Sequence, residues 1–235
     1  MRNQIRFKVY GRYALFTDPI TRVGGEKFTY QVPTYQALKG ICESIYWKPT
    51  FIWIIDSVRV MNPIRTQAQG IRPINYNGGN TLSYYTYLMD VEYEVTAHIE
   101  WNLNRPDLEQ DRNDHKHFLI AKRMIQKGGR RDVFLGTREC QAYVEPLEED
   151  NNRGYYDNQG DMHFDLMFHS FEYPSETGKE ELSALFWKPI MKNGVIFFGT
   201  DQQLYKRKRV KDMKAEYVAT SGLIEPTLQS VLEEV

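Results

Sequence analysis

The sequence predicts an α+β fold, in which an antiparallel sheet carries two helices and a smaller β-rich part follows. Three observations favour this class. Apolar and polar residues alternate with the period of a strand in several segments, and two other segments repeat apolar residues at helical spacing. After Asp150 short apolar and aromatic segments such as HFDLMFHSFEYP and NGVIFFGT are separated by Gly, Pro and Asn, which is typical of short strands.

The chain begins with a strand, a helix and a second strand. Residues 5–10 alternate as a half-buried strand does. Pro33 opens a segment whose apolar residues recur at helical spacing as far as Trp47, and proline is tolerated in a first helical turn. Residues 51–60 are rich in β-branched and aromatic side chains, which predicts the second strand.

An insertion separates these elements from the next strand. Residues around 62–90 contain prolines and an Asn-Gly-Gly-Asn turn, and we expect an inserted loop or hairpin there. Residues 91–101 alternate cleanly and predict a third strand. A fourth strand is expected over residues 137–146, after the second helix.

The segment DRNDHKHFLIAKRMIQKGGRRD, residues 111–132, predicts that second helix. Asn113 or Asp111 can cap its start, and two glycines supply its stop. Residues 1–146 therefore read β-α-β-β-α-β, the order of ferredoxin-like (RRM-like) folds. We expect such a domain over 1–146, followed by a small β-rich C-terminal domain with a basic tail over 147–235. This order hosts many functions and selects none.

Composition is that of an ordinary globular protein, with 41% hydrophobic and 26% charged residues. Cys42 and Cys140 lack metal-ligand spacing and are expected to be reduced, buried thiols of a cytoplasmic protein. The longest apolar run, residues 51–55, is too short to span a membrane. The net charge of −1 does not indicate a nucleic-acid partner. Basic clusters and frequent tyrosines nevertheless suit RNA, although most tyrosines are expected to pack on sheets.

His115, Lys116 and His117 fall in the first turns of the second helix, where free N–H groups and the helix dipole attract phosphate. The same dipole favours neutral imidazole, the form that a general base needs. The two histidines would point about 200° apart, which disfavours a shared metal. Acidic neighbours could hold a hard cation and keep a metal-dependent nuclease as an alternative. They are Asp107, Glu109, Asp111 and Asp114.

Two basic segments are candidates for phosphate contacts. Gly128-Gly129-Arg130-Arg131 combines flexible backbone with two guanidinium groups, although a glycine helix cap followed by solvated arginines explains the same residues. Lys206-Arg207-Lys208-Arg209 is a denser cluster of positive charge. No nucleotide-binding, zinc, calcium or serine-nucleophile motif is present, so no cofactor is expected.

Three segments closely resemble the CRISPR-associated Cas-five-d family, the type I-C (Dvulg) branch of the repeat-associated RNA-binding superfamily. They are YALFTDPITRVGGEKFTYQVPTYQALKGICESIYWKPT, RPDLEQDRNDHKHF and GGRRDVFLGTRECQAYVEP. The resemblance implies an endoribonuclease that cuts CRISPR precursor RNA at the base of the repeat hairpin without metal. It also implies that the enzyme stays on the crRNA 5′ handle with the other subunits of the type I-C interference complex. Double-stranded DNA is a further candidate partner.

The resemblance also implies the site residues. The family's active site holds a tyrosine late in the first helix and an adjacent lysine-histidine pair, which match Tyr46, Lys116 and His117. Attack by the RNA 2′-OH would leave a 2′,3′-cyclic phosphate, with His117 suited to general base, Tyr46 to acid and Lys116 to charge stabilisation. Which of His117 and Tyr46 is base stays open, as does the role of His115. A non-catalytic crRNA-binding scaffold and a ferredoxin-like protein without RNA are the alternatives.

The family's glycine-rich loop matches Gly128, Gly129, Arg130 and Arg131, which are therefore expected to contact RNA. Lys206, Arg207, Lys208 and Arg209 are expected to do so on charge alone. No functional residue after Asp150 follows from the resemblance.

Overall fold

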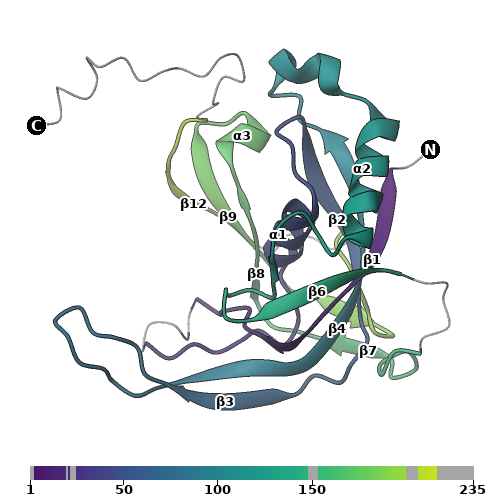
Figure 1. Ribbon diagram of the computed structural model, residues 1–235. Helices are drawn as coiled ribbons and strands as arrows, with labels where there is room; N and C mark the ends of the chain where they lie inside the picture. The colour runs from purple at the N-terminus through teal and green to yellow at the C-terminus, as the bar shows by residue number, and fades with distance from the viewer. Residues whose placement is uncertain (1–2, 20, 22–24, 148–152, 200–205, 216–235) are drawn as a thin grey trace, which may run out of the picture.

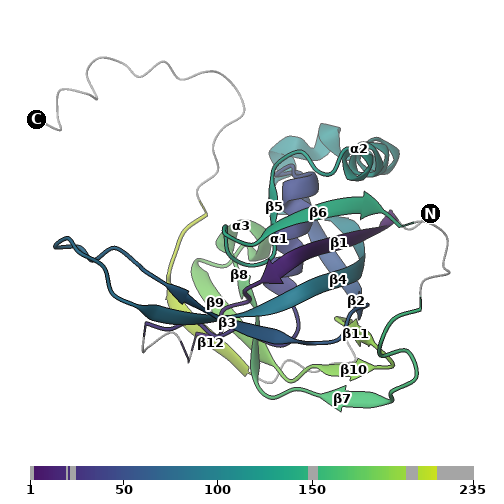
Figure 2. The same ribbon diagram turned by 60° about the horizontal axis from the view of Figure 1, so that its bottom comes forward.

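The computed structural model describes residues 3–19, 21, 25–147, 153–199 and 206–215. They form a nine-stranded sheet and a separate three-stranded sheet, in which every ladder between named strands is antiparallel. Two longer helices lie on one side of the large sheet (Figures 1 and 2). The elements are β1 (Gln4–Ala14), α1 (Tyr35–Ile45), β2 (Phe51–Val60), β3 (Thr66–Ile71), β4 (Ser83–Trp101), the 3₁₀ helix η2 (Pro106–Asp111), α2 (Asp114–Gln126), β5 (Val133–Phe134), β6 (Gln141–Pro146), β7 (Asp161–His163), β8 (Met167–Glu172), α3 (Pro174–Thr177), β9 (Glu181–Trp187), β10 (Ile190–Lys192), β11 (Val195–Phe197) and β12 (Lys206–Asp212).

The centre of the large sheet has the strand order β6-β1-β4-β2, and its buried side chains form the core with α1 and α2. Both helices begin after a capping side chain, which the sequence predicts for α2 only. For α1 the sequence places Pro33 in the first turn, but the helix begins at Tyr35 and Thr34 is its cap. Thr34 Oγ1 accepts from the Ala37 amide at 3.1 Å, and Asn113 Oδ1 accepts from the Lys116 amide at 3.0 Å. Asn113 rather than Asp111 is therefore the cap of α2.

The predicted elements are present, but several boundaries differ, and three of these differences affect the argument. The expected insertion is a hairpin, because β3 pairs with a β4 that is 19 residues long. The fourth strand begins only at Gln141, because the Cys140 amide donates to the Thr137 carbonyl at 3.0 Å and closes a turn. Tyr46 lies outside α1, since its backbone is extended at φ −159° and ψ 127°.

Strands from both sides of the expected domain boundary at residue 146 share the large sheet. β11 pairs with β2, and β10 and β7 follow it at that edge. The remaining C-terminal strands form the small sheet in the order β12-β9-β8. The sequence does not indicate that the C-terminal strands are divided between two sheets, because three-residue strands such as β10 and β11 are too short to show an alternation of apolar and polar residues.

Two expectations from composition can be compared with the structure. Cys42 and Cys140 are free and buried, as predicted. Burial raises the pKa of both thiols, which keeps them protonated and unreactive at neutral pH. Among the described helices, none is long and apolar enough to cross a membrane.

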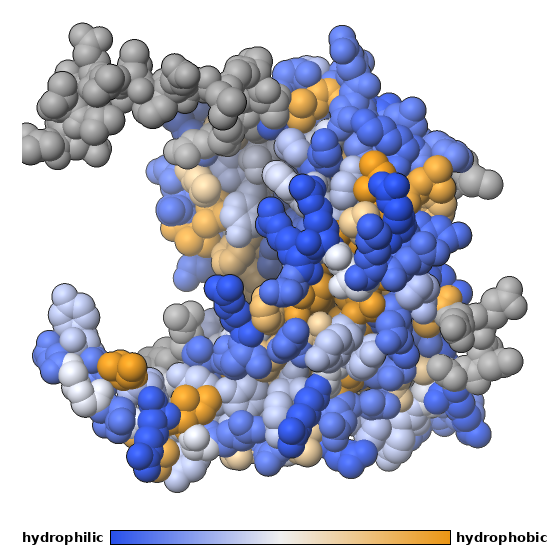
Figure 3. Space-filling view, viewed as in Figure 1, coloured by the Kyte–Doolittle hydropathy of each residue, from blue (hydrophilic) through white to orange (hydrophobic). Residues whose placement is uncertain are grey.

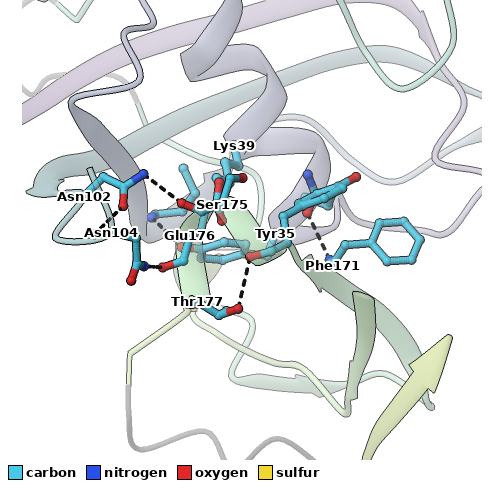
Figure 4. Close-up of polar contacts among 11 residues, drawn as sticks. Tyr35, Lys39, Asn102, Asn104, Phe171, Ser175, Glu176 and Thr177 are labelled. Carbon is cyan, nitrogen blue, oxygen red and sulfur yellow. Dashed lines mark hydrogen bonds and ion pairs between the residues drawn. The ribbon is translucent and has the colours of Figure 1, made fainter. Parts of the chain in front are cut away.

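Polar contacts attach α3, which lies between two strands of the small sheet, to α1 and to the residues that follow β4 (Figure 4). The Asn102 and Asn104 side chains donate to the carbonyls of Ser175 and Glu176 at 2.9 and 2.6 Å. Lys39 Nζ lies 2.5 and 2.6 Å from the two carboxylate oxygens of Glu176, and its side chain is only 5% exposed. A buried ammonium needs such a partner.

We expect Glu176→Met to destabilise the protein by about 3–5 kcal/mol, because it removes the carboxylate that binds the buried Lys39 ammonium and leaves only the charge of Glu43, to which Lys39 has no hydrogen bond among the described contacts. Denaturant unfolding measures this loss. The double variant Lys39→Met/Glu176→Met is expected to recover most of it, since paired removal of a buried ion pair is often nearly neutral. Equal stability of the single and double variants would contradict this account.

Acid sensitivity is expected from His169 of β8, whose ring stacks on Tyr35 at a centroid distance of 4.5 Å. Burial lowers the pKa of His169 to about 4. In the unfolded chain His169 binds a proton near pH 6.5, whereas in the folded protein it binds this proton only near pH 4. The free energy of unfolding therefore falls as the pH drops from 6.5 towards 4. The loss is expected to reach about 3 kcal/mol. His169→Phe should remove this part of the pH dependence in urea unfolding.

Candidate active site

The end of α1 and the start of α2 bring together side chains that are far apart in sequence. Tyr46 follows α1, and its hydroxyl oxygen lies 2.8 Å from Nδ1 of His117 in the first turns of α2. Lys116 joins them through Asp111, the last residue of η2. The structure therefore gathers Tyr46, Lys116 and His117 at one corner.

The ring of His117 has a partner at each nitrogen. Nε2 lies 2.7 Å from the backbone carbonyl oxygen of Asp111. A carbonyl only accepts, so Nε2 carries a hydrogen. In the neutral ring Nδ1 is then the acceptor, and it receives the hydrogen bond that Tyr46 donates. The arrangement is poised to move a proton between Tyr46 and His117.

Asp111 holds this group together. Its carboxylate accepts from Lys116 Nζ at 2.5 Å and from Thr50 Oγ1 at 2.7 Å. Burial alone would raise the pKa of Asp111, but the hydrogen bonds from Lys116 and Thr50 outweigh burial and the pKa is lowered. Asp111 is therefore an anion at neutral pH, and one oxygen lies 3.5 Å from Nε2 of His117.

The tyrosine-histidine pair is shielded from water. His117 has no exposed surface and Tyr46 only 3%. The rings of Phe51 and Trp101 pack on the imidazole at centroid distances of 5.3 and 5.7 Å. Burial raises the pKa of Tyr46, the Asp111 charge raises it further, and the nearby charge of Arg130 partly opposes both. Tyr46 therefore keeps its proton at neutral pH.

Lys116 is the member of this group that faces solvent, with 48% of its side chain exposed. His115 is exposed while His117 is buried, as expected for residues on different sides of a helix. Next to Tyr46, the large ring of Trp47 is also 48% exposed. A polyanion that reaches this corner would first meet Lys116.

The loop of residues 128–131 closes α2 and docks on the end of α1. Gly128 and Gly129 donate to the Ile125 and Met124 carbonyls at 3.0 and 2.8 Å, which is a glycine C-cap. The Arg130 and Arg131 amides donate to the Ile45 and Ser44 carbonyls, both at 3.1 Å. All four amides thus have protein partners, and only the arginine side chains are left to bind a phosphate. The loop lines a polar hollow of about 400 Å³ and places Arg130 near Tyr46.

The basic strand β12 lies apart from this corner, and its arginines are already paired. Arg207 contacts Glu172 and Glu181 at 2.5 and 2.6 Å. Arg209 pairs with Glu181 at 3.4 Å and with Asp212. Lys206 and Lys208 are exposed, and in the part of the chain described here no ion pair involves them. The cluster is therefore less available to an anion than its sequence suggests.

The carboxylates that kept a metal site open do not converge. Asp107 binds Arg105 at 2.8 and 2.6 Å, and Asp114 accepts from Asn3 at 2.6 Å. Asp111 is occupied by Lys116 and Thr50. Across the described ranges no three His, Cys, Asp or Glu side chains are placed to share a metal ion. The described residues therefore do not gather these carboxylates into one cluster.

Comparisons with known proteins give a consistent result. The family model of the Cas5d type, described as CRISPR-associated protein Cas5, matches residues 4–199. A protein of Mannheimia succiniciproducens named CRISPR pre-crRNA endoribonuclease Cas5d is 30% identical, covering 83% of this chain and 95% of its own. A Thermus thermophilus protein of the same name is 30% identical, covering 70% and 74%. The crystal structure of a CRISPR-associated protein superposes with a TM-score of 0.73 at 40% identity, covering 87% and 96%.

Proposed function

Because the chain belongs to the CRISPR-associated Cas5 family, we propose that it is a pre-crRNA endoribonuclease whose reaction takes place at Tyr46, Lys116 and His117. The observation that carries this proposal is the hydrogen bond between Tyr46 and Nδ1 of His117, directly beside the exposed Lys116. The names of the two relatives support the substrate class. The resemblance in sequence and the geometry of the corner point to the same three side chains.

In this proposal the RNA 2′-OH attacks the adjacent phosphate and needs no metal. The RNA has to displace the cover over Tyr46, which is 3% exposed in the free protein, so that its 2′-OH reaches the Tyr46 oxygen. The 2′-OH then gives its proton to this oxygen while the Tyr46 proton passes to Nδ1 of His117, because the imidazole lies behind Tyr46 and is fully buried. The anionic Asp111 stabilises the imidazolium that forms. Lys116 leaves Asp111 for the phosphate, offsets charge on the phosphorane and protonates the departing 5′ oxygen. A 2′,3′-cyclic phosphate and a 5′-OH result.

We further propose that residues 1–146 are a ferredoxin-like, RRM-like unit with the C-terminal part attached. The strand order β6-β1-β4-β2 and two helices on one face support this. After cleavage the protein would stay on the 5′ handle of the crRNA among the other subunits of a type I-C interference complex. Arg130 and Arg131 would position the RNA backbone near the site. No described feature favours double-stranded DNA in particular.

The test is cleavage of a labelled cognate repeat hairpin in excess EDTA, beside the same RNA with a 2′-deoxy nucleotide at the cut. We expect one cut in the normal RNA, a cyclic phosphate end, and no cut in the deoxy RNA at unchanged affinity. Tight binding without any cut would make the chain a crRNA-holding scaffold. Cutting only after metal is added would refute the metal-free mechanism.

A further inference from the structure

One face of the small sheet combines lysines with phenylalanines. Lys206 of β12 lies opposite Phe186 of β9, which in turn lies opposite Phe168 of β8. Lys208 lies opposite Ala184 in the same way. Side chains of directly opposed residues lie on the same face, and alternate residues along a strand return to it. These two lysines and the phenylalanines therefore share one face.

The acidic residues of the small sheet lie on its other face. Arg209 and Glu172 are both in register with Ser183, two residues from Glu181 along β9. The ion pairs of Arg207 and Arg209 with these glutamates are formed there. The alternation of β12 thus separates two arginines, which pair with carboxylates, from Lys206 and Lys208.

The phenylalanines of this face form a cluster of their own. Phe168 lies 4.8 Å from Phe171 and 6.0 Å from Phe186 between ring centroids. All three are partly exposed, and none is among the side chains that form the main core or pack against it. Apolar atoms are visible over β9 and β12 in Figure 3. The main core therefore does not account for this cluster.

A hollow extends from Phe168 on this face along α1 towards the loop of residues 128–131. Phe168 lines a cavity of about 470 Å³ whose wall includes Gln36, Gly40 and Ser44 of α1. The Ser44 carbonyl accepts from Arg131, so this end of the hollow adjoins the loop beside Tyr46. From Gln36 to Ser44 the helix rises about 12 Å. That length matches three or four stacked nucleotides at roughly 3.4 Å each.

We propose that Phe168, Phe171, Phe186, Lys206 and Lys208, the aromatic-lysine face, bind an unpaired segment of RNA that flanks the hairpin cut at Tyr46. Bases stack on the exposed parts of the phenylalanine rings, and the lysines bind phosphates. Aromatic rings interspersed with cations and free of carboxylates fit a single strand, whose bases are open to stacking. This assignment rests on the proposed function, because it takes its substrate from there.

The test uses the double variant Phe186→Leu/Lys206→Glu, which changes two cross-strand neighbours on the face. Its control is Phe197→Leu/Lys192→Glu, which removes an exposed ring and a lysine from the β10-β11 hairpin at the edge of the large sheet. Each is titrated with two RNAs, the hairpin with its unpaired flanks and the hairpin trimmed of them. Lys206→Glu alone serves if the double variant does not fold.

We expect the double variant to bind the flanked RNA about 10- to 100-fold more weakly than the wild type and the trimmed RNA equally well. The control should bind both RNAs as the wild type does. Equal losses of affinity for both RNAs would overturn the assignment. No loss of affinity for either RNA would also overturn it and would indicate that the aromatic-lysine face binds a protein instead. If the wild type does not cut the RNA but its binding depends on the unpaired flanks in this way, the proposed endoribonuclease activity is refuted while the RNA-binding role of the aromatic-lysine face is retained.

Discussion

Replacing His117 by alanine is expected to slow cleavage of bound repeat RNA by about 10²- to 10⁴-fold, the usual contribution of a proton-transfer group. Affinity for RNA should change little, because His117 has no exposed surface through which to touch it. Single-turnover cleavage at saturating protein measures the rate, and filter binding of uncleavable 2′-deoxy RNA measures the affinity. A loss of affinity as large as the loss of rate would contradict a role in the chemical step.

The matched control for this variant is His115→Ala, since His115 is an exposed histidine two residues away. We expect it to cleave at nearly the wild-type rate. Tyr46→Phe tests whether the pair acts as one unit. Because a proton reaches His117 through the Tyr46 hydroxyl in our mechanism, the double variant should be no slower than the slower single variant. Multiplying effects would show that the two side chains act independently.

The residues of this corner could be predicted from the sequence, but their arrangement could not. The cap at Asn113 and the glycine stop at residues 128–129 follow from local rules and place His117 in the first turns of α2. Resemblance adds Tyr46, which no spacing connects to His117. The contact between them depends on the backbone leaving α1 at Tyr46 in an extended conformation. A helical pattern does not encode that departure.

Asp111 is the residue whose part sequence reasoning misjudged. It was a candidate only as a helix cap or a metal ligand, because an acidic residue before a helix suggests both. In the structure η2 ends at Asp111 and directs its carbonyl to His117 and its carboxylate to Lys116. The sequence likewise predicts Phe51 and Trp101 only as strand residues and carries no signal for the role of Thr50. Such contacts arise from tertiary packing and leave no periodic signal.

The variant Asp111→Asn separates the charge of this residue from its shape. The backbone carbonyl that fixes the His117 tautomer is kept, while Lys116 and the imidazolium lose their anion. One carboxylate oxygen lies 3.5 Å from Nε2 of His117. Two opposite charges at about this separation attract by roughly 1 kcal/mol in water and roughly 4 kcal/mol near a protein surface, so cleavage of bound RNA should slow by about 10- to 100-fold. This loss is smaller than that for His117→Ala, because the proton path from Tyr46 remains.

RNA binding by the same variant should move in the opposite direction. In the wild type a phosphate competes with Asp111 for the ammonium of Lys116, and the variant removes this competitor. Affinity should therefore rise at low salt. The slope of log Kd against log salt concentration should increase by about the amount that one additional phosphate contact contributes. Thr50→Val is the control, because it removes a hydrogen bond from Asp111 but leaves the charge. A variant that was merely unstable would lose cleavage and binding together, so slower cleavage with tighter binding is the result that identifies Asp111 as the residue that positions Lys116 and His117.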